Sequence, residues 1–235
     1  LWINGGATTE VICASNSHIT QHEIGACSSI ASILPISINS KKGILKAQDF
    51  EPLIKQSGIY DMARTSILEV ENTIGGAIYP ISNLQEIKAL AEKNNLKVHM
   101  DGARLLNASV ASKTKVDIIT QYCDTVTFCL SKGLGAPMGS MLCGTKDFIN
   151  EARRYRKMLG SGMRQIGLMA AAGIFALNNN IERLEIDHLR AKEIANVLKN
   201  NENIILQDFP ETNIVFFNEK NKSAQETINK LKDLG

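Results

Sequence analysis

The chain contains the run Phe128-Cys129-Leu130-Ser131-Lys132-Gly133-Leu134-Gly135-Ala136-Pro137-Met138-Gly139-Ser140. An apolar, strand-like segment ends here at a lysine that is followed by several glycines. Most lysines are solvated surface charges. A lysine at the end of a buried strand can instead be partly desolvated, which frees its amine to attack a carbonyl carbon. The glycine spacing does not match the GxGxxG fingerprint, so we do not expect a nicotinamide site.

Short strand-like segments alternate with helix-like segments on both sides of this run. The expected strands are 10–14, 32–37, 66–71, 97–100, 124–130 and 140–143. The expected helices are 83–93, a basic helix capped by Thr145 that runs to residue 158, and an Ala- and Leu-rich helix, 165–178, that we expect to be buried. This alternation predicts an α/β fold with a mostly parallel sheet and helices on both faces.

The pattern changes after Asn180. Residues 181–200 are typical of a long charged amphipathic helix, 212–218 of a strand and 224–234 of another helix. We therefore expect a large domain at 1–180 and the start of a smaller α+β domain at 181–235.

Composition excludes several classes of partner. The 235 residues carry a net charge of +2, which gives no reason to expect nucleic acid or a membrane surface as a partner. No run approaches the roughly 20 apolar residues of a membrane helix. The five cysteines are scattered along the chain without the spacing of a zinc site. An odd, scattered set is typical of reduced core cysteines in a cytosolic protein. The chain opens at Leu1 and stops just after a helix-like pattern, so we expect a fragment with both ends missing.

Polar residues follow three of the expected strands. Asp101 follows one, Glu71 another, and Lys132 a third, so a parallel sheet would gather them at one edge, where such sheets bind ligands. A carboxylate beside the pyridine nitrogen of pyridoxal phosphate (PLP) keeps that ring an electron sink, and Asp101 suits this task. Arg104 could bind a carboxylate or a cofactor oxygen in a bidentate manner. Alternatively, Asp101 only caps a helix over 103–111.

Longer motifs connect these residues to a known family. Residues 99–108, 130–140 and 152–165, together with 10–12, 17–19 and 69–73, resemble the low-specificity L-threonine aldolases, which are PLP enzymes of the aspartate aminotransferase fold (fold type I). The resemblance covers roughly residues 5–218. It implies cleavage of L-threonine or L-allo-threonine to glycine and acetaldehyde, in threonine catabolism and glycine biosynthesis, by a cytoplasmic homodimer or homotetramer.

The resemblance also implies roles for individual residues. Lys132 would carry the cofactor, Asp101 would contact the ring nitrogen, and His18 would stack on the ring or act as a base. The remaining implied cofactor contacts are Arg104, Ser131, Lys157 and Arg164, the last two reaching the phosphate, often from a neighbouring subunit. Taken alone, His18 is more typical of a surface histidine, and basic residues 153–157 of a solvated helix face. His18 and His22 have the spacing of a metal pair, but no third ligand is evident, so we expect no metal site.

Two departures from the family pattern bear on activity. Residues 71–76, Glu-Asn-Thr-Ile-Gly-Gly, are shorter than the family's Glu-Asn-Thr-His-Asn segment and lack its histidine, so His18 or a water would have to serve the substrate hydroxyl. A Ser-Gly-Thr phosphate loop upstream and a carboxylate-binding arginine downstream are expected to lie outside this sequence. Two alternatives therefore stay open, which are a non-catalytic remnant of this fold and a PLP lyase acting on another amino acid.

Overall fold

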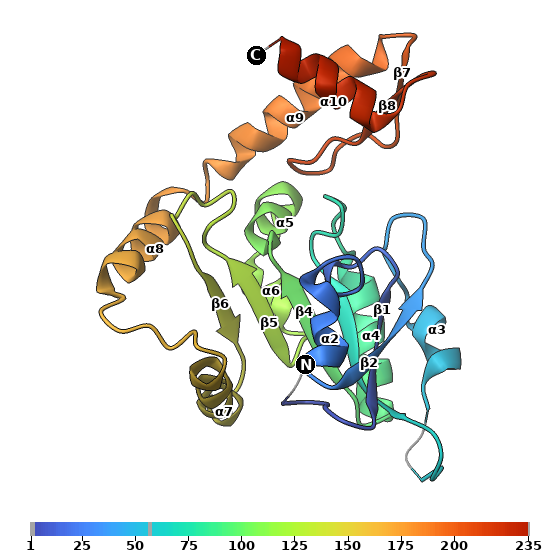
Figure 1. Cartoon of the computed structure of the whole chain (residues 1–235), viewed down its shortest axis with the longest axis vertical. Coiled ribbons are helices and arrows are strands. Elements are labelled where there is room, and N and C mark those ends of the chain that lie inside the picture. Colours follow the sequence, from blue (N-terminus) through green and yellow to red (C-terminus); the bar gives the residue numbers. More distant parts are fainter. Residues whose placement is uncertain (1–2, 56–57, 235) are drawn as a thin grey trace.

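The central sheet places the carboxyl ends of its parallel strands at one edge. The computed structural model describes residues 3–55 and 58–234. Its six-stranded sheet has the order β2-β1-β3-β4-β5-β6, in which the first five strands are parallel and β6 runs antiparallel to β5. The strands are β1 (Thr9–Ala14), β2 (Ile33–Ile38), β3 (Arg64–Glu71), β4 (Lys97–Gly102), β5 (Thr125–Cys129) and β6 (Ser140–Cys143). Figure 1 shows the sheet with its helices and the C-terminal elements beyond it.

Helices connect and flank these strands. Between β1 and β3 lie α1 (His18–Gln21), the 3-10 helix η1 (Glu23–Gly25), α2 (Ala26–Ser29), α3 (Ala47–Phe50) and η2 (Glu51–Leu53). From β3 to the end of the sheet region lie α4 (Ile81–Lys93), α5 (Leu105–Ser112), α6 (Val116–Thr120), α7 (Lys146–Met158) and α8 (Gly167–Asn179). The elements α9 (Leu184–Lys199), β7 (Ile204–Leu206), β8 (Phe217–Glu219) and α10 (Ala224–Asp233) form what we name the C-terminal unit, which has its own two-stranded antiparallel sheet.

Strand alternation sends side chains into two separate apolar clusters. On one face, Ile12 of β1 and Leu68 of β3 pack with Leu84 and Ile87 of α4. On the opposite face, Val11, Ile33 and Ile67 pack with Cys27 of α2. Helices therefore cover both faces near β1 and β3, whereas all four residues of β6 are exposed.

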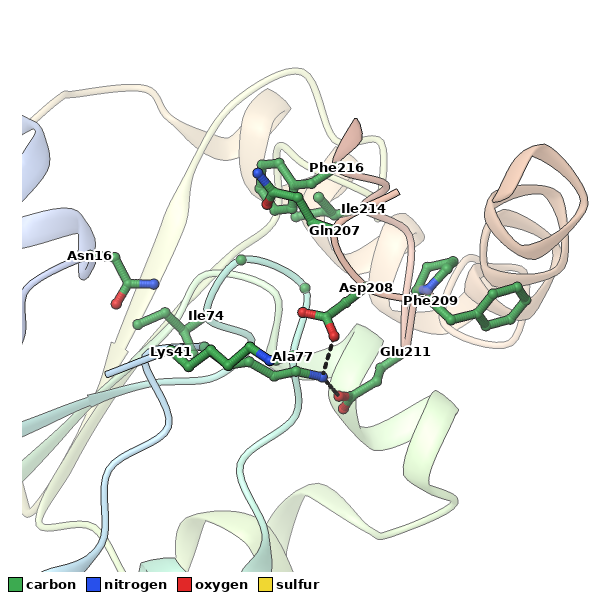
Figure 2. Close-up of a pocket in the computed structure, with 14 residues that line it drawn as sticks. Asn16, Lys41, Ile74, Ala77, Gln207, Asp208, Phe209, Glu211, Ile214 and Phe216 are labelled. Carbon is green, nitrogen blue, oxygen red and sulfur yellow. Dashed lines mark ion pairs between the residues drawn. The ribbon is translucent and has the colours of Figure 1, made fainter. Parts of the chain in front are cut away.

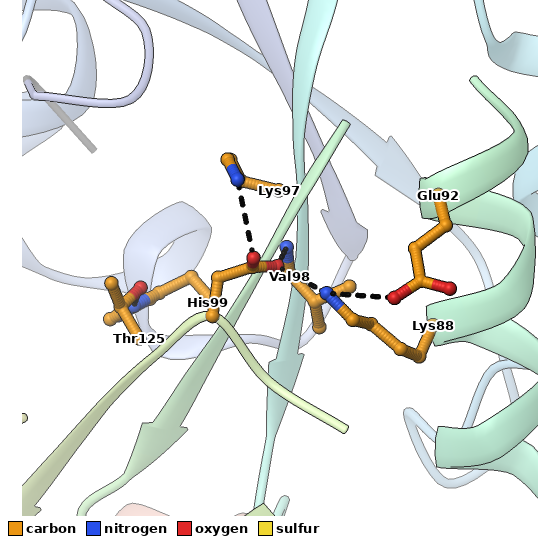
Figure 3. A network of polar contacts seen from close by, with 7 residues as sticks. Lys88, Glu92, Lys97, Val98, His99 and Thr125 are labelled. Carbon is orange, nitrogen blue, oxygen red and sulfur yellow. Dashed lines mark hydrogen bonds and ion pairs between the residues drawn. The ribbon is translucent and has the colours of Figure 1, made fainter. Parts of the chain in front are cut away.

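A polar network fixes α4 against the sheet (Figure 3). The Asp124 carboxylate accepts hydrogen bonds from the Lys88 amine at 2.9 Å, the Val98 amide at 2.9 Å and the Lys97 amine at 3.3 Å. Burial opposes ionisation of Asp124, but the Val98 amide and Lys88 outweigh it and hold its pKa below the ordinary value. Because Lys88 lies on α4 and Val98 on β4, we name this set the Asp124 network and regard it as a link between helix and sheet.

All six expected strands are present, with ends that differ by at most two residues from the expectation. The cap of α7 is also confirmed, since the Thr145 hydroxyl accepts a hydrogen bond from the Phe148 amide. The expectation that 165–178 is buried is wrong, because α8 exposes Leu168 (76%) and Phe175 (63%).

Two further expectations are corrected. The strand expected at 212–218 is displaced, because β8 starts only at Phe217 while Thr212 is buried in a loop. All five cysteines are free, as expected, but Cys143 is exposed and is not a core residue. Within the described ranges, no helix has the length and apolar character needed to cross a membrane.

Candidate functional site

Residues from three neighbouring strands meet at the carboxyl edge of the sheet. The parallel register pairs Glu71 of β3 with Asp101 of β4, and Asp101 with Thr127 of β5. Lys132 lies three residues beyond Cys129, the last residue of β5. The sequence-based expectation that parallel strands would gather these polar residues at one edge therefore agrees with the register.

The alternative that Asp101 caps the following helix is wrong, because α5 starts at Leu105, its N-cap is Arg104 and no side chain binds there. Asp101 Oδ1 accepts a hydrogen bond from the Ala103 amide at 2.9 Å, which shapes the turn into α5. The carboxyl is half-buried, so the turn does not enclose it completely. Arg104 is also half-buried and lines, with Lys132, a small cavity of about 10 Å³. The structure thus brings Arg104 and Lys132 together around the turn that Asp101 begins.

The loop that carries Lys132 has a defined backbone. The Lys132 carbonyl accepts a hydrogen bond from the Gly135 amide at 2.8 Å, and the Leu130 carbonyl accepts one from the Ala136 amide at 3.1 Å. Gly135 has a φ of +74°, a backbone conformation that is unfavourable for any residue with a side chain. Lys132 itself is exposed, as is Ser131, so the desolvation expected from the apolar flank is not observed.

His18 lies at the same edge, as the first residue of α1, the short helix after β1. Its backbone amide donates to Glu71 Oε2 at 2.8 Å, and its Nε2 lies 2.7 Å from Glu23 Oε1. The His18 and His22 rings contact each other, with centroids 4.7 Å apart and planes inclined by 35°. Glu71 therefore fixes the backbone of the His18 turn, while Glu23 binds its ring.

Two carboxyls of β3 belong to this edge, and the sequence reasoning assigned a role to neither. Burial raises the pKa of Glu71; the His18 amide and the charges of His18 and Lys132 partly offset this, and Asp101 adds to it. Burial raises the pKa of Glu69 still more, and the nearby charges of Glu71 and Asp101 act in the same direction. The alternation in β3 was a usable signal, because positions two apart on a strand share a face.

Buried polar atoms without a partner cluster beside these carboxyls. Ser17 Oγ, Asn72 Nδ2, Thr73 Oγ1 and both carboxylate oxygens of Glu69 are buried and make no hydrogen bond within the described residues. Such groups are costly unless a ligand or a water satisfies them. PLP needs hydrogen-bond donors, a carboxylate and a lysine amine close together, and this edge supplies all three, so the residues present fit the ring end of that cofactor.

The two residues expected at the cofactor phosphate do not join this group in the described chain. Lys157 lies in the last turn of α7 and Arg164 in the connection to α8, and both are exposed. Because β6 runs antiparallel to β5, it leads away from the carboxyl edge, and Figure 1 shows α7 at the opposite end of the sheet from α5. Ile74, which stands near the family's missing histidine, is buried in the apolar core.

A larger cavity of about 280 Å³ lies between the loop after β3 and the C-terminal unit (Figure 2). Lys42 makes ion pairs there with Asp208 at 3.3 Å and Glu211 at 3.6 Å, which are the dashed lines of the figure. The Thr212 hydroxyl donates to the Gly76 carbonyl at 2.7 Å. These contacts attach the segment between β7 and β8 to the connection after β2, through Lys42, and to the loop after Glu71, through Gly76. The described residues include no group of three or more His, Cys, Asp or Glu side chains arranged to hold a metal ion.

Comparison with known proteins assigns the family. The model of the beta-eliminating lyase family matches residues 5–221. The chain belongs to the beta-eliminating lyase family. Within this family the chain is 43% identical, over 209 residues, to the low specificity L-threonine aldolase of Escherichia coli strain K12, which covers 88% of this chain and 62% of that protein. It is 39% identical over 236 residues to a protein named probable low-specificity L-threonine aldolase 2 of Arabidopsis thaliana, with 97% and 66% covered. The chain thus spans less than two thirds of the length of these relatives.

Solved structures have the same fold. A threonine aldolase of Leishmania major superposes with a TM-score of 0.80 at 22% identity, covering 97% of this chain and 67% of that one. This likeness confirms the expected α/β fold with a mostly parallel sheet.

Proposed function

We propose that this chain is the cofactor-binding part of a PLP-dependent aldolase that cleaves L-threonine or L-allo-threonine to glycine and acetaldehyde. The observation that carries the proposal is the pairing of Asp101 with Glu71 in the sheet and the position of Lys132 beside them, in a chain similar to threonine aldolases. Such an enzyme would act in threonine breakdown and glycine formation.

PLP, when bound, would take up the electron pair released as the Cα–Cβ bond of the substrate breaks. Asp101 would keep the pyridine nitrogen protonated, because its carboxylate favours the cationic ring. Lys132 would hold the cofactor through its amine, and Ser131 would lie beside it. Arg104, which lines a cavity with Lys132, would bind a ring oxygen or the substrate carboxylate.

His18 is our candidate for the group that takes the proton from the substrate hydroxyl. The buried Ile74 cannot do so, because its side chain has no titratable atom. Glu23 lies 2.7 Å from His18 Nε2 and would hold the ring in place, as carboxylates do for histidine bases. His18 would also contact the cofactor ring through its imidazole face.

We further infer a homodimer or homotetramer, in which Lys157 and Arg164 would reach the cofactor phosphate of a neighbouring subunit. Support comes from the apolar side chains that α7 and α8 expose, including Met158 (61%) and Leu168 (76%), since large exposed apolar patches mark association surfaces. The free state of all five cysteines supports a reducing compartment, and we infer the cytoplasm.

The test is covalent attachment of PLP. The protein is incubated with PLP, treated with borohydride and digested, and the modified peptide is identified by mass. We expect the label on Lys132, and we expect Lys132→Ala to lose both the label and threonine cleavage. Lys146→Ala, which removes another lysine from the start of α7, is the control and should keep both. A label on a different lysine, or normal cleavage by Lys132→Ala, would contradict the proposal. A protein that takes up no PLP would favour the non-catalytic remnant, and labelling with turnover of another amino acid would favour a different PLP lyase.

A further inference from the structure

The loop that carries Lys132 is held by residues that lie about fifty positions later in the chain. We name residues 130–136 the lysine loop. Asn180 Nδ2 donates to the Leu134 carbonyl at 2.7 Å, and Arg183 Nη2 donates to the Gly133 carbonyl at 2.9 Å. Two successive carbonyls just after Lys132 are therefore bound by the segment that leads into α9. Figure 1 shows α9 beginning beside the connection between β5 and β6.

Apolar contacts seal the same junction. Leu134 of the lysine loop and Leu184 of α9 are 2% and 1% exposed, and they share a cluster with Leu130 and Ala176. A Cβ built on Gly133 would lie only 2.7 Å from Leu184 Cδ2. A side chain at Gly133 would therefore force Leu184 to move, so the absence of one is what allows α9 to approach the loop so closely.

Polar contacts around this junction orient the guanidinium group of Arg183. Arg183 Nη1 lies 3.5 Å from Asp187 Oδ1, while Nη2 binds the Gly133 carbonyl. One turn further along α9, the buried His188 accepts a hydrogen bond at Nε2 from Asn107 Nδ2 of α5 at 3.1 Å. Since an amide nitrogen can only donate, Nε2 is the acceptor and the proton of a neutral His188 is on Nδ1. The start of α9 thus contacts the lysine loop and also α5, which follows Asp101.

We propose that Asn180 and Arg183 are positioning residues, through which the start of the C-terminal unit fixes the lysine loop and so the location of Lys132. The catalytic meaning of this inference rests on the proposed function, whereas the contacts of Asn180 and Arg183 with the lysine loop are independent of it. The Lys132 side chain is exposed, so packing of the side chain does not hold it in place. Its backbone is instead defined by the bonds that the next residues make.

The experiment compares Arg183→Gln and Asn180→Ala with Arg190→Gln, which removes an exposed arginine from the same helix and serves as the control. Hydrogen exchange of peptide 130–136 is measured in protein without PLP. We expect exchange to become about five- to tenfold faster in the two variants, because each loses a hydrogen bond to the loop. The control should exchange like the unchanged protein.

A second measurement is the rate at which borohydride-trapped PLP appears on Lys132. We expect this rate to fall several-fold in Arg183→Gln and Asn180→Ala at a temperature where all proteins are folded by circular dichroism. A role in global stability alone would leave the rate for the folded protein unchanged. Exchange and labelling that both match Arg190→Gln would overturn the inference. If the unchanged protein takes up no PLP, the proposed function fails, and the exchange data still decide whether Asn180 and Arg183 hold the loop.

Discussion

The buried carboxyl of Glu69 makes the stability of this protein depend on pH in a way that one substitution should remove. Glu69 is 1% exposed and neither of its oxygens has a partner among the described residues. Its pKa is raised by burial and by Glu71 and Asp101, so the folded chain keeps a proton there that the unfolded chain releases. Between the ordinary carboxyl pKa and the raised one, the native state binds more protons than the unfolded state. Stability should therefore fall as pH rises.

The size of the effect follows from the proton count. One proton difference changes the free energy of unfolding by about 1.4 kcal/mol per pH unit. Glu69→Gln keeps the shape and cannot ionise, so it should remove this slope and become the more stable protein as pH increases. The assay is urea unfolding at several pH values from about 5 to about 7. Glu86→Gln, at an exposed position of α4, is the matched control and should follow the unchanged protein. Parallel pH curves for Glu69→Gln and the unchanged protein would refute the reasoning.

Three other outcomes follow from the structure. Asp124→Asn should lower the free energy of unfolding by about 1–3 kcal/mol, measured by urea unfolding, because the Asp124 network loses its charge-assisted bonds. Since the pKa of Asp124 is lowered in the folded protein, the unchanged protein should lose the same stability as acid protonates Asp124. Burial, and to a lesser extent Lys192, lower the pKa of His188 in the folded protein. The unfolded chain therefore binds the proton first, and the free energy of unfolding should fall as pH drops below about 6.5. His188→Gln should reduce this dependence of the free energy of unfolding on pH. Cys143 is exposed and should react with a maleimide in the folded protein. Cys13 should stay unlabelled until the protein unfolds, because it is buried and burial raises the pKa of its thiol to about 12. Mass analysis of the labelled peptides checks both expectations.

The sequence was most informative where backbone periodicity and chemistry point the same way. The strands before Asp101 and Lys132 could be located from their short apolar runs, and their parallel pairing then predicts that the two residues lie at one edge. The cap at Thr145 was predictable because a hydroxyl before a helix binds a free amide. These features depend on local sequence or on a general rule of sheet topology.

Features that depend on what covers a surface were not predictable. The composition of α8 shows that it needs an apolar partner, but cannot say whether that partner is the same chain, and here Leu168 and Phe175 are exposed. The apolar flank of Lys132 suggested burial, yet Lys132 is exposed and only Leu130, Leu134 and Ala136 of the lysine loop are buried. Glu69 was missed because a carboxyl in a strand is normally assigned to solvent, and its burial arises from elements far apart in sequence.

The order of synthesis gives the contacts of Arg183 another meaning. A growing chain emerges from the ribosome with its N-terminal part first, so the sheet strands through β6 are available before α9 exists. The carbonyls of Gly133 and Leu134 acquire their partners only when Asn180 and Arg183 have appeared. The lysine loop therefore cannot acquire these two bonds until the residues that lead into α9 have been synthesised.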